Sequence, residues 1–471
     1  MAGQWMHNGC KDTAFARRAS KGYREGDMKL ATRQILFVLF FLVFIVAAPA
    51  IVLYTAGYRY NFRSWQIVQT GVLSLTSFPR GATVVIDDIP QTTRTPAVFK
   101  NLIPGQHTIR IERTGYTAWE KTLEIESHTT TFADDITLFP HSLPSLSLAL
   151  EQDSGAEIHR ESGSIAHLKR DKEWTEVWVE QAENERLVSR LPLAPDAPVT
   201  MEWSAGGGAL ALRSEQNNSA EILLVSLFDG ATLPVTELYP TMTTGWWDPR
   251  IEGRYFVRDK QGVWDVGFPE GKNPLLHEDI QRLTVDNGEH ITLQSVADRT
   301  AVSVQQATSV GSLLTYLPRG DYAFADAPAW LSLLVEPTRQ EITLIDRGQS
   351  EPIRLTARAT AWRWDETKDR LLYTDGYELH LYDRHARTDE TLTRVSDPII
   401  DVAWDAHGNT VFYAQQATVS SVELDRRDQR NTNTLVSAEM IQHIWTSPDG
   451  TILSVEATVD GTYGIWNKEL E

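Results

Sequence analysis

The sequence predicts a mainly β protein with one N-terminal transmembrane helix, and three observations indicate this fold class. Residues 34–54 contain no charged residue. Residues 71–139 carry short β-branched runs separated by turn residues. Residues 143–471 repeat a pattern of β runs with a period of about 40 residues, typical of propeller blades. We therefore expect a small β-sandwich-like domain followed by an eight-bladed β-propeller, with seven blades as the alternative.

The uncharged segment, Gln34 to Tyr54, has the length of a membrane span. An α-helix of this length extends about 31 Å, and the hydrocarbon core of a bilayer is about 30 Å thick. A buried soluble helix is the alternative, but such helices rarely stay apolar on every face. A cleaved signal peptide is a further alternative, because Ala48-Pro49-Ala50 contains an A-x-A-like pattern. Signal h-regions have only about 7–15 residues, so we favour an uncleaved signal anchor.

Charge is distributed unevenly about this segment. Residues 1–33 have a balance of +4, whereas the whole chain is −19, which leaves −23 for residues 34–471. The basic residues of this tail are Lys11, Arg17, Arg18, Lys21, Arg24, Lys29 and Arg33. Basic residues beside a span stay in the cytoplasm, so we expect a cytoplasmic N-terminus and extracytoplasmic C-terminal domains at the cell membrane. The strongly negative part argues against nucleic acid as a partner.

The single cysteine, Cys10, lies in the basic tail, which we expect to be flexible. The exported part therefore has no disulfide to stabilise it. His7 and Cys10 have no second pair of ligands nearby, so a metal site is not expected there. Residues 55–70 form the expected juxtamembrane linker. Its aromatic residues, with Tyr54, are expected either in the membrane interface or packed on the next domain: Tyr58, Tyr60, Phe62 and Trp65.

Four short runs in residues 71–139 are expected to be strands, because they are β-branched and partly alternating. They are Val72–Leu75, Thr83–Asp87, Thr108–Glu112 and Leu123–Glu126. Turn residues separate them, in Pro79-Arg80-Gly81, Asp87-Asp88-Ile89-Pro90 and Pro104-Gly105.

Residues 71–116 resemble the PEGA domain family. The family's naming motif is present as Pro79-Arg80-Gly81-Ala82, with arginine where glutamate is usual. Thr95-Pro96 and the run from Leu102 to Tyr116 extend the resemblance. PEGA domains are small β modules of surface and envelope proteins, so the resemblance implies architecture and location and carries no catalytic residue.

From residue 143 onward, similar units follow one another. The clearest contain Met201-Glu202-Trp203-Ser204, Arg363-Trp364-Asp365, Ala403-Trp404-Asp405-Ala406-His407-Gly408 and Ile444-Trp445-Thr446-Ser447-Pro448-Asp449-Gly450. Weaker copies centre on Trp247, Leu283 and Phe324, and an earlier unit runs from Ile158 to Val188. These units are similar to the W-x-x-D-G blades of Tol-type and WD-related propellers, a resemblance that implies fold and no particular function.

Each tryptophan is expected to pack between neighbouring blades, in preference to forming an aromatic platform for a ligand. Asp-Gly or His-Gly then provides a tight turn into the second strand. The last unit lacks a fourth strand, and the alternating run Ser145–Leu150 precedes the first unit. We expect this run to complete the last blade and close the ring, because an open sheet edge would otherwise be exposed. Removal of residues 143–152 should then destabilise the whole ring.

No catalytic, cofactor-binding or metal-binding residue is predicted, and the ligand-binding residues are unknown at this point. The sequence has no H-E-x-x-H, G-x-S-x-G or Walker motif. Ser447-Pro448-Asp449-Gly450 and Asp286-Asn287-Gly288-Glu289 are expected to be turns. The acidic pairs Asp87-Asp88 and Asp134-Asp135 are expected in solvated turns. The histidines have no metal-ligand spacing, namely His107, His128, His141, His167, His277, His380 and His443.

These expectations give five segments: a cytoplasmic tail (1–33), a transmembrane helix (34–54), a linker (55–70), a PEGA domain (71–140) and a β-propeller (141–471). The favoured function is a single-pass surface protein whose propeller binds or scaffolds an envelope polymer or surface protein, without a cofactor. The alternative is a membrane-tethered glycan or peptide hydrolase with acidic residues in the propeller channel, which two facing carboxylates would support. A purely structural envelope component is the third hypothesis.

Overall fold

The computed structural model describes residues 30–470, except for 56, 62–64, 152–154, 161, 172, 182–183, 192–196, 217–218, 270–274, 279 and 307–310. Most of the basic tail, including His7 and Cys10, lies outside the described residues. The chain divides into two compact units, residues 1–70 and residues 71–471, and each is described by itself.

The first unit contains the apolar helix α1 (Leu30–Thr55). Its part from Thr32 to Thr55 is long and apolar enough to cross a membrane, and none of it is buried. A hairpin of β1 (Tyr58–Asn61) and β2 (Gln66–Gln69) occupies most of the expected linker. The structure therefore gives this segment regular pairing that its composition did not predict.

Residues 71–140, here called the small β domain, form two sheets around one core. A three-stranded sheet has the order β6-β3-β9, and a four-stranded sheet has the order β5-β4-β7-β8. The strands are β3 (Gly71–Phe78), β4 (Thr83–Ile86), β5 (Ile89–Arg94), β6 (Ala97–Leu102), β7 (Gly105–Glu112), β8 (Trp119–Ile125) and β9 (Thr130–Thr137). Both sheets contribute to the core, which includes Leu73, Val84, Ile111, Leu123 and Ile136.

The expected turn at Pro79-Arg80-Gly81 is explained by its hydrogen bonds. Gly81 has a φ of +84°, which favours glycine, and its N–H donates to the carbonyl of Thr95 at 2.8 Å. Ala82 is fully buried and its N–H donates to Thr95 Oγ1 at 3.0 Å. Arg80 is exposed, so arginine in place of the usual glutamate does not disturb the turn.

Strand β5 was not predicted, because Ile89-Pro90 was interpreted as part of a turn. The turn consists of Asp87 and Asp88 alone, whose φ values of 49° and 63° fit a two-residue hairpin. Pro90 then lies in β5, an edge strand of its sheet. Proline is tolerated at an edge because one side of the strand needs no ladder hydrogen bond.

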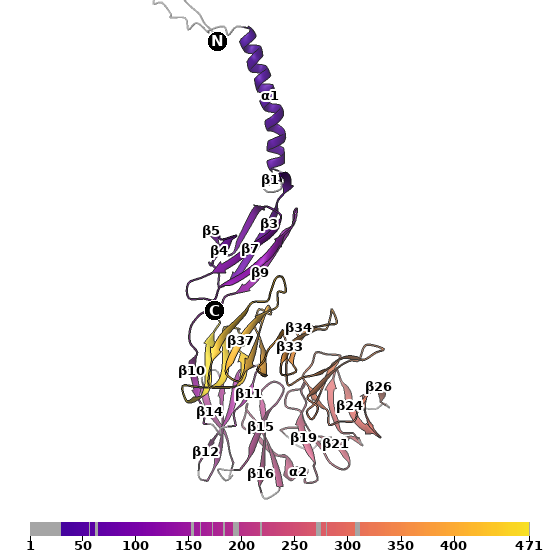
Figure 1. Ribbon diagram of the computed structural model, residues 1–471. Helices are drawn as coiled ribbons and strands as arrows, with labels where there is room; N and C mark the ends of the chain where they lie inside the picture. Colours follow the sequence, from indigo (N-terminus) through magenta and orange to yellow (C-terminus); the bar gives the residue numbers. More distant parts are fainter. Residues whose placement is uncertain are drawn as a thin grey trace, which may run out of the picture. The chain divides into compact units, whose positions relative to one another are not determined.

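Residues 145–469 form eight four-stranded antiparallel sheets, numbered here in chain order (Figure 1). Sheet 1 is β11 (Glu157–His159), β12 (Ser164–Arg170), β13 (Thr175–Gln181) and β14 (Asn184–Leu191). Sheet 2 is β15 (Val199–Trp203), β16 (Ala209–Gln216), β17 (Ser219–Ser226) and β18 (Thr232–Pro234), followed by the short helix α2 (Val235–Leu238). Sheet 3 is β19 (Thr244–Trp247), β20 (Tyr255–Arg258), β21 (Gly262–Asp265) and β22 (Leu275–Glu278). Sheet 4 is β23 (Arg282–Asp286), β24 (Glu289–Val296), β25 (Arg299–Gln306) and β26 (Ser312–Pro318).

The remaining four sheets continue the same order. Sheet 5 is β27 (Ala323–Ala325), β28 (Leu331–Glu336), β29 (Glu341–Asp346) and β30 (Ile353–Arg358). Sheet 6 is β31 (Ala361–Trp364), β32 (Arg370–Thr374), β33 (Glu378–Asp383) and β34 (Thr388–Arg394). Sheet 7 is β35 (Ile399–Trp404), β36 (Thr410–Gln415), β37 (Thr418–Glu423) and β38 (Thr432–Ser437). Sheet 8 is β39 (Met440–Thr446), β40 (Ile452–Val459), β41 (Thr462–Glu469) and β10 (Ser145–Ala149).

Apolar clusters join every sheet to the next. Sheets 1 and 2 share Leu168 and Leu212, and sheets 6 and 7 share Leu372 and Val411. Equivalent clusters join the other consecutive sheets, from sheet 2 to sheet 6 and from sheet 7 to sheet 8. A further cluster containing Ile165 joins sheet 8 back to sheet 1. This arrangement is typical of a β-propeller, in which each sheet buries its faces against its neighbours.

The last sheet is completed by a strand from far earlier in the chain, as the sequence predicted. Strand β10 pairs antiparallel with β41, and Leu146 is opposite Trp466. Figure 1 shows β10 at the edge of the yellow C-terminal sheet. The pairing covers the edge of β41 that would otherwise be exposed.

The small β domain is attached to sheet 7 within the second unit. The indole N–H of Trp119 donates to Glu423 Oε1 at 2.9 Å. The ammonium of Lys121, which is fully buried, donates to the carbonyl of Asp425 at 2.6 Å and lies 3.2 Å from Glu423 Oε2. Arg427 Nη1 in turn donates to the carbonyl of Phe132 at 2.6 Å. The loop between β37 and β38 therefore provides most of this attachment.

The closing strand pair gives a testable prediction at Gly464. A Cβ at Gly464 would lie 2.2 Å from the carbonyl oxygen of Leu148, so Gly464→Ala should separate β10 from β41. We expect the free energy of unfolding to fall by about 1–3 kcal/mol, measured as a lower Tm by calorimetry.

The matched control for this prediction is Gly348→Ala. A Cβ at Gly348 would meet nothing closer than Asp346 Oδ1 at 3.5 Å, so its Tm should be unchanged. Equal effects of the two substitutions would contradict a role of the β10–β41 pair in stability.

Candidate functional site

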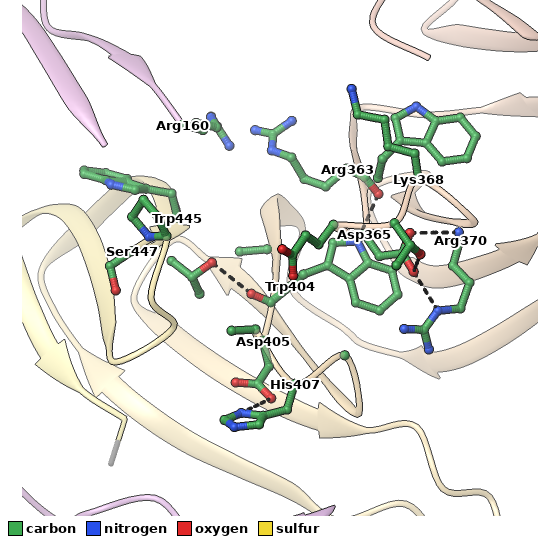
Figure 2. Close-up of a pocket in the computed structure, with 18 of the residues that line it drawn as sticks. Arg160, Arg363, Asp365, Lys368, Arg370, Trp404, Asp405, His407, Trp445 and Ser447 are labelled. Carbon is green, nitrogen blue, oxygen red and sulfur yellow. Dashed lines mark hydrogen bonds and ion pairs between the residues drawn. The ribbon is translucent and has the colours of Figure 1, made fainter. Parts of the chain in front are cut away.

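A pocket of about 750 Å³ lies where the first strands of sheets 6, 7 and 8 end (Figure 2). Its walls are the turns that follow β31, β35 and β39, together with Arg160 from sheet 1. The lining residues are Arg160, Asp326, Trp362–Lys368, Arg370, Ala403–Gly408 and Ile444–Pro448. Pockets of this size accommodate small molecules or a few residues of a peptide.

The turns that form the pocket share one hydrogen-bonding pattern. The N–H of Asp405 donates to the carbonyl of Thr410 at 3.1 Å, and the N–H of Gly408 donates to the carbonyl of Asp405 at 2.9 Å. The same pattern begins at Ser204, Asp365 and Ser447. Its fourth residue has positive φ each time, in Gly207 (73°), Lys368 (55°), Gly408 (71°) and Gly450 (73°). The predicted tight turns at His407-Gly408 and Asp449-Gly450 are therefore confirmed.

Tryptophans at the end of the first strands connect neighbouring sheets. The indole N–H of Trp404 in sheet 7 donates to the carbonyl of Arg363 in sheet 6 at 3.1 Å. Trp203, Trp247 and Trp364 make the equivalent bond to the preceding sheet, at 3.0, 3.1 and 3.0 Å. The predicted packing of these tryptophans between sheets is thus confirmed. The sequence did not indicate that each indole would also donate a hydrogen bond to the preceding sheet.

Trp445 differs from this pattern. Its turn begins at Ser447, so Thr446 occupies the position equivalent to Trp404, and Trp445 is one residue earlier. The Thr446 hydroxyl donates to the carbonyl of Trp404 at 3.0 Å, whereas Trp445 packs with Ile165 and Ile465 between sheets 8 and 1. The spacing of tryptophans along the chain did not reveal this offset of one residue.

Most ionised side chains around the pocket are paired with each other. Lys368 Nζ lies 2.6 Å from Asp326 Oδ2, and Arg370 Nε lies 2.9 Å from Asp365 Oδ2. Burial by itself raises the pKa of Asp365, but hydrogen bonds from Arg370 and from the backbone of Asp369 outweigh it and lower that pKa. The guanidinium of Arg370 also lies over the ring of Trp404, 4.8 Å from its centroid.

A second polar cluster surrounds Asp401 on β35. Arg160 Nη1 lies 2.9 Å from one oxygen of Asp401, and Arg363 Nη2 lies 3.1 Å from the other. The backbone N–H groups of Val402 and Ile444 also donate to Asp401, at 2.9 and 3.1 Å. One buried carboxylate therefore binds guanidinium groups from sheets 1 and 6. Figure 2 shows these two side chains, Arg160 and Arg363, at the edge of the pocket.

The lining of this pocket gives no support to the hydrolase alternative. A glycosidase needs one carboxyl group with a raised pKa beside a second carboxylate, but Asp365 has a lowered pKa and Asp326 is bound to Lys368. A second cavity of about 310 Å³ includes one carboxylate, Glu202. Its pKa is raised by desolvation, but it has no partner carboxylate in that lining.

The residues singled out in the sequence occupy separate places. Asn287 and Gly288 both have positive φ between β23 and β24, which confirms the predicted hairpin turn. Asp286, however, also bonds Arg250 in sheet 3 at 2.8 Å, which the sequence did not indicate. Asp87 accepts hydrogen bonds from His107 and the N–H of Thr108, at 2.6 and 3.0 Å, so this carboxylate has a structural role beyond a solvated turn.

The structure describes only some of the side chains in the acidic pair Asp134-Asp135 and among the histidines singled out in the sequence. Asp134 is exposed and accepts a hydrogen bond from Thr76 at 3.2 Å, while the side chains of Asp135 and His277 lie outside the described residues. His167 is buried and bonds Glu185 at 2.8 Å. Among the residues that the structure describes, no group of three or more His, Cys, Asp or Glu side chains is placed to hold a metal ion.

Comparison with known proteins identifies one segment. A family model for the PEGA domain matches residues 70–140, in agreement with the resemblance seen in the sequence. A comparison with curated proteins finds no match. The Tol-type resemblance of the later residues is not confirmed by these comparisons.

Several solved structures are similar to this chain at low identity. A eukaryotic initiation factor has 11% identity and a TM-score of 0.46, covering 70% of this chain and 95% of that chain. Saccharomyces cerevisiae Sqt1 has 12% identity and a TM-score of 0.45, with 70% and 99% covered. A chain of the mitotic checkpoint complex has 11% identity and a TM-score of 0.39, with 70% and 90% covered. These values are too low to indicate a shared function.

Two of the four tryptophans that line the pocket, Trp404 and Trp445, give a matched pair of substitutions. Trp404→Phe leaves the carbonyl of Arg363 without its donor, whereas the indole N–H of Trp445 donates no hydrogen bond within the described residues. Both changes remove similar apolar volume. We expect Trp404→Phe to lower the free energy of unfolding by about 1–2 kcal/mol more than Trp445→Phe, measured by chemical denaturation. Equal losses would contradict the hydrogen-bonding role.

A buried carboxyl group in sheet 8 predicts a pH dependence. Glu456 is 1% exposed. One of its oxygens accepts a hydrogen bond from the Tyr463 hydroxyl, and the other has no hydrogen-bond partner among the described residues. Burial raises the pKa of Glu456, against the opposing effects of Tyr463 and His443. The folded protein therefore favours the protonated form, so its contribution to stability is full below the unfolded pKa of about 4.3 and is lost as pH rises through the folded pKa.

Glu456→Gln removes this titration. We expect the Tm of the variant relative to the parent protein to increase from about pH 5 to about pH 8, measured by calorimetry across that range. Glu366→Gln is the control, since Glu366 is exposed and its Tm difference should stay constant with pH. A constant difference for Glu456→Gln as well would contradict the raised pKa.

Proposed function

We propose that this chain is a membrane-anchored scaffold that binds a protein partner through a closed, eight-bladed β-propeller. The observation that carries this proposal is the pocket formed by turns of sheets 6, 7 and 8, whose ionised side chains are mostly paired with each other. Such a surface offers shape and directed polar groups without an activated acid, base or nucleophile. Propellers serve many functions, so the proposal depends on the pocket and not on the fold.

The eight sheets support eight blades. Each consecutive pair shares an apolar cluster, and the cluster around Trp445 joins the last sheet to the first. The β10–β41 pair then completes the last blade. Two sheets around one core likewise support a β-sandwich for the PEGA domain.

The anchor and its orientation are part of the same proposal. An exposed apolar helix from Thr32 to Thr55 supports a single membrane span, and the positive balance of residues 1–33 supports a cytoplasmic N-terminus. We place the boundaries at 33/34, 54/55, 70/71 and 140/141. The PEGA domain and propeller are then extracytoplasmic, where an envelope or surface protein is the expected partner.

Protease treatment of intact cells tests this arrangement. In a chain with an epitope tag at each end, we expect externally added protease to remove the C-terminal tag and to leave the N-terminal tag intact, because the bilayer protects the tail. Detection is by immunoblot, and lysed cells, in which both tags are lost, are the control. Loss of the N-terminal tag in untreated cells, with a mature chain that begins near residue 51, would show a cleaved signal peptide and contradict the anchor.

A further inference from the structure

We propose that the pocket between sheets 6, 7 and 8 binds an extended protein segment with an acidic side chain, whose carboxylate pairs with Arg160 and Arg363. This inference rests on the proposed scaffold function and names the class of segment and the place where it binds. It is argued from the ion pairs of the pocket, the hydrogen bonds of Asp401, and the burial of the tryptophans in the lining.

The charge balance leaves one cationic place in the pocket. Lys368 and Arg370 each have a carboxylate partner, at 2.6 and 2.9 Å. Arg160 and Arg363 instead share a single carboxylate, Asp401. Two guanidinium groups beside one carboxylate give a local excess of positive charge, which favours an anionic ligand at this point. Two other carboxyl groups, Glu157 and Glu456, also interact with Arg160, but burial raises the pKa of each and so disfavours their charged forms.

Both carboxylate oxygens of Asp401 already accept hydrogen bonds from within the protein. Its oxygens accept hydrogen bonds from Arg160, Arg363, the N–H of Val402 and the N–H of Ile444. A guanidinium group has five N–H donors, and neither Nε atom donates in these contacts. The side chains of Arg160 and Arg363 remain 25% and 29% exposed, so their spare donors can reach a ligand.

The two guanidinium groups are also fixed in position. Arg363 Nη1 donates to the carbonyl of Trp362, and Arg160 Nη2 lies 3.1 Å from His443 Nδ1. Figure 2 shows the two side chains pointing toward one another at one side of the pocket. Because their positions are set by the protein, little side-chain entropy is lost when a carboxylate binds.

The aromatic lining favours a peptide over an acidic saccharide. Sugar rings bind by stacking on open aromatic faces, but Trp404 and Trp445 are only 8% and 4% exposed. The other two tryptophans of the lining, Trp362 and Trp364, are partly buried against the apolar cluster between sheets 5 and 6. Arg370 covers one face of Trp404. The volume of about 750 Å³ instead suits a short run of residues in an extended conformation.

A carboxylate at the rim of the pocket provides an independent test of the charge of the ligand. Glu366 is exposed in the turn after β31 and has no ion-pair partner among the described residues. Its negative charge opposes an acidic ligand. Glu366→Gln should therefore strengthen binding. A variant that only impaired folding would weaken binding instead, so the two effects have opposite signs.

The experiment uses the full-length protein in detergent micelles and an array of immobilised octapeptides of varied sequence. Each peptide is present in a Glu form, a matched Gln form and a phosphoserine form. We expect peptides that bind to prefer the Glu form about tenfold over the Gln form. Arg363→Gln should reduce this ratio to about one, and Glu366→Gln should raise it about two- to threefold, as expected for one exposed charge.

The matched control is Arg394→Gln, which removes the same charge from the last strand of the same sheet, where Arg394 pairs with Glu378. It should leave the Glu-to-Gln ratio unchanged. The ratio compares two peptides on one protein preparation, so it does not depend on how much of each variant is folded. The Tm of each variant is measured alongside.

The outcomes separate this inference from the function on which it rests. Peptides bound with a ratio of one, a ratio that Arg363→Gln leaves unchanged, or binding of the phosphoserine form alone would overturn the acidic segment and leave a protein-binding scaffold. Binding of trigalacturonate in place of every peptide would overturn it in favour of a saccharide. Failure of all peptides to bind, together with no protein cross-linked to the full-length chain in cells, would overturn the scaffold function itself.

Discussion

The pairing of β10 with β41 is the interaction on which the rest of the second unit depends. It joins residues that are more than 300 positions apart, and the strand that does so follows directly after the PEGA domain. Lys468 on β41 is buried, and its ammonium donates to the carbonyls of Pro140 and Ser142 at 2.6 and 2.9 Å. The same few residues therefore complete the last sheet and fix the connection to the PEGA domain.

This coupling has a consequence for the attachment of the PEGA domain. Phe139 packs in the cluster between sheets 7 and 8, and Lys121 binds the loop after β37. These contacts add to the linker and restrict rotation more than a linker alone does. The pocket beside them includes His407, whose ring lies 4.5 Å from that of Phe78, so the PEGA domain forms part of its surroundings.

The sequence predicted the elements that depend on local patterns. Period-2 runs located most strands, and Asn-Gly and His-Gly located turns, because positive φ is a local requirement that glycine and asparagine meet. Pairing between distant residues could be predicted only for β10, because the last repeat unit lacked a fourth strand and its sheet edge would otherwise be exposed. The Asp401 cluster was not predicted, because Arg160, Arg363 and Asp401 are brought together by closure of the ring and share no spacing along the chain.

The offset at Trp445 shows how the repeat produces a specific site. Sheets 6 and 7 place a tryptophan before the turn and use its N–H to bind the preceding sheet. Sheet 8 has threonine there, whose shorter side chain binds the carbonyl of Trp404. On the same strand of sheet 8, the carbonyl of Ile444 accepts a hydrogen bond from Arg160 of sheet 1, which also reaches Asp401 of sheet 7. The departure from the repeat therefore coincides with the place where a guanidinium of sheet 1 crosses sheet 8 to bind a carboxylate of sheet 7.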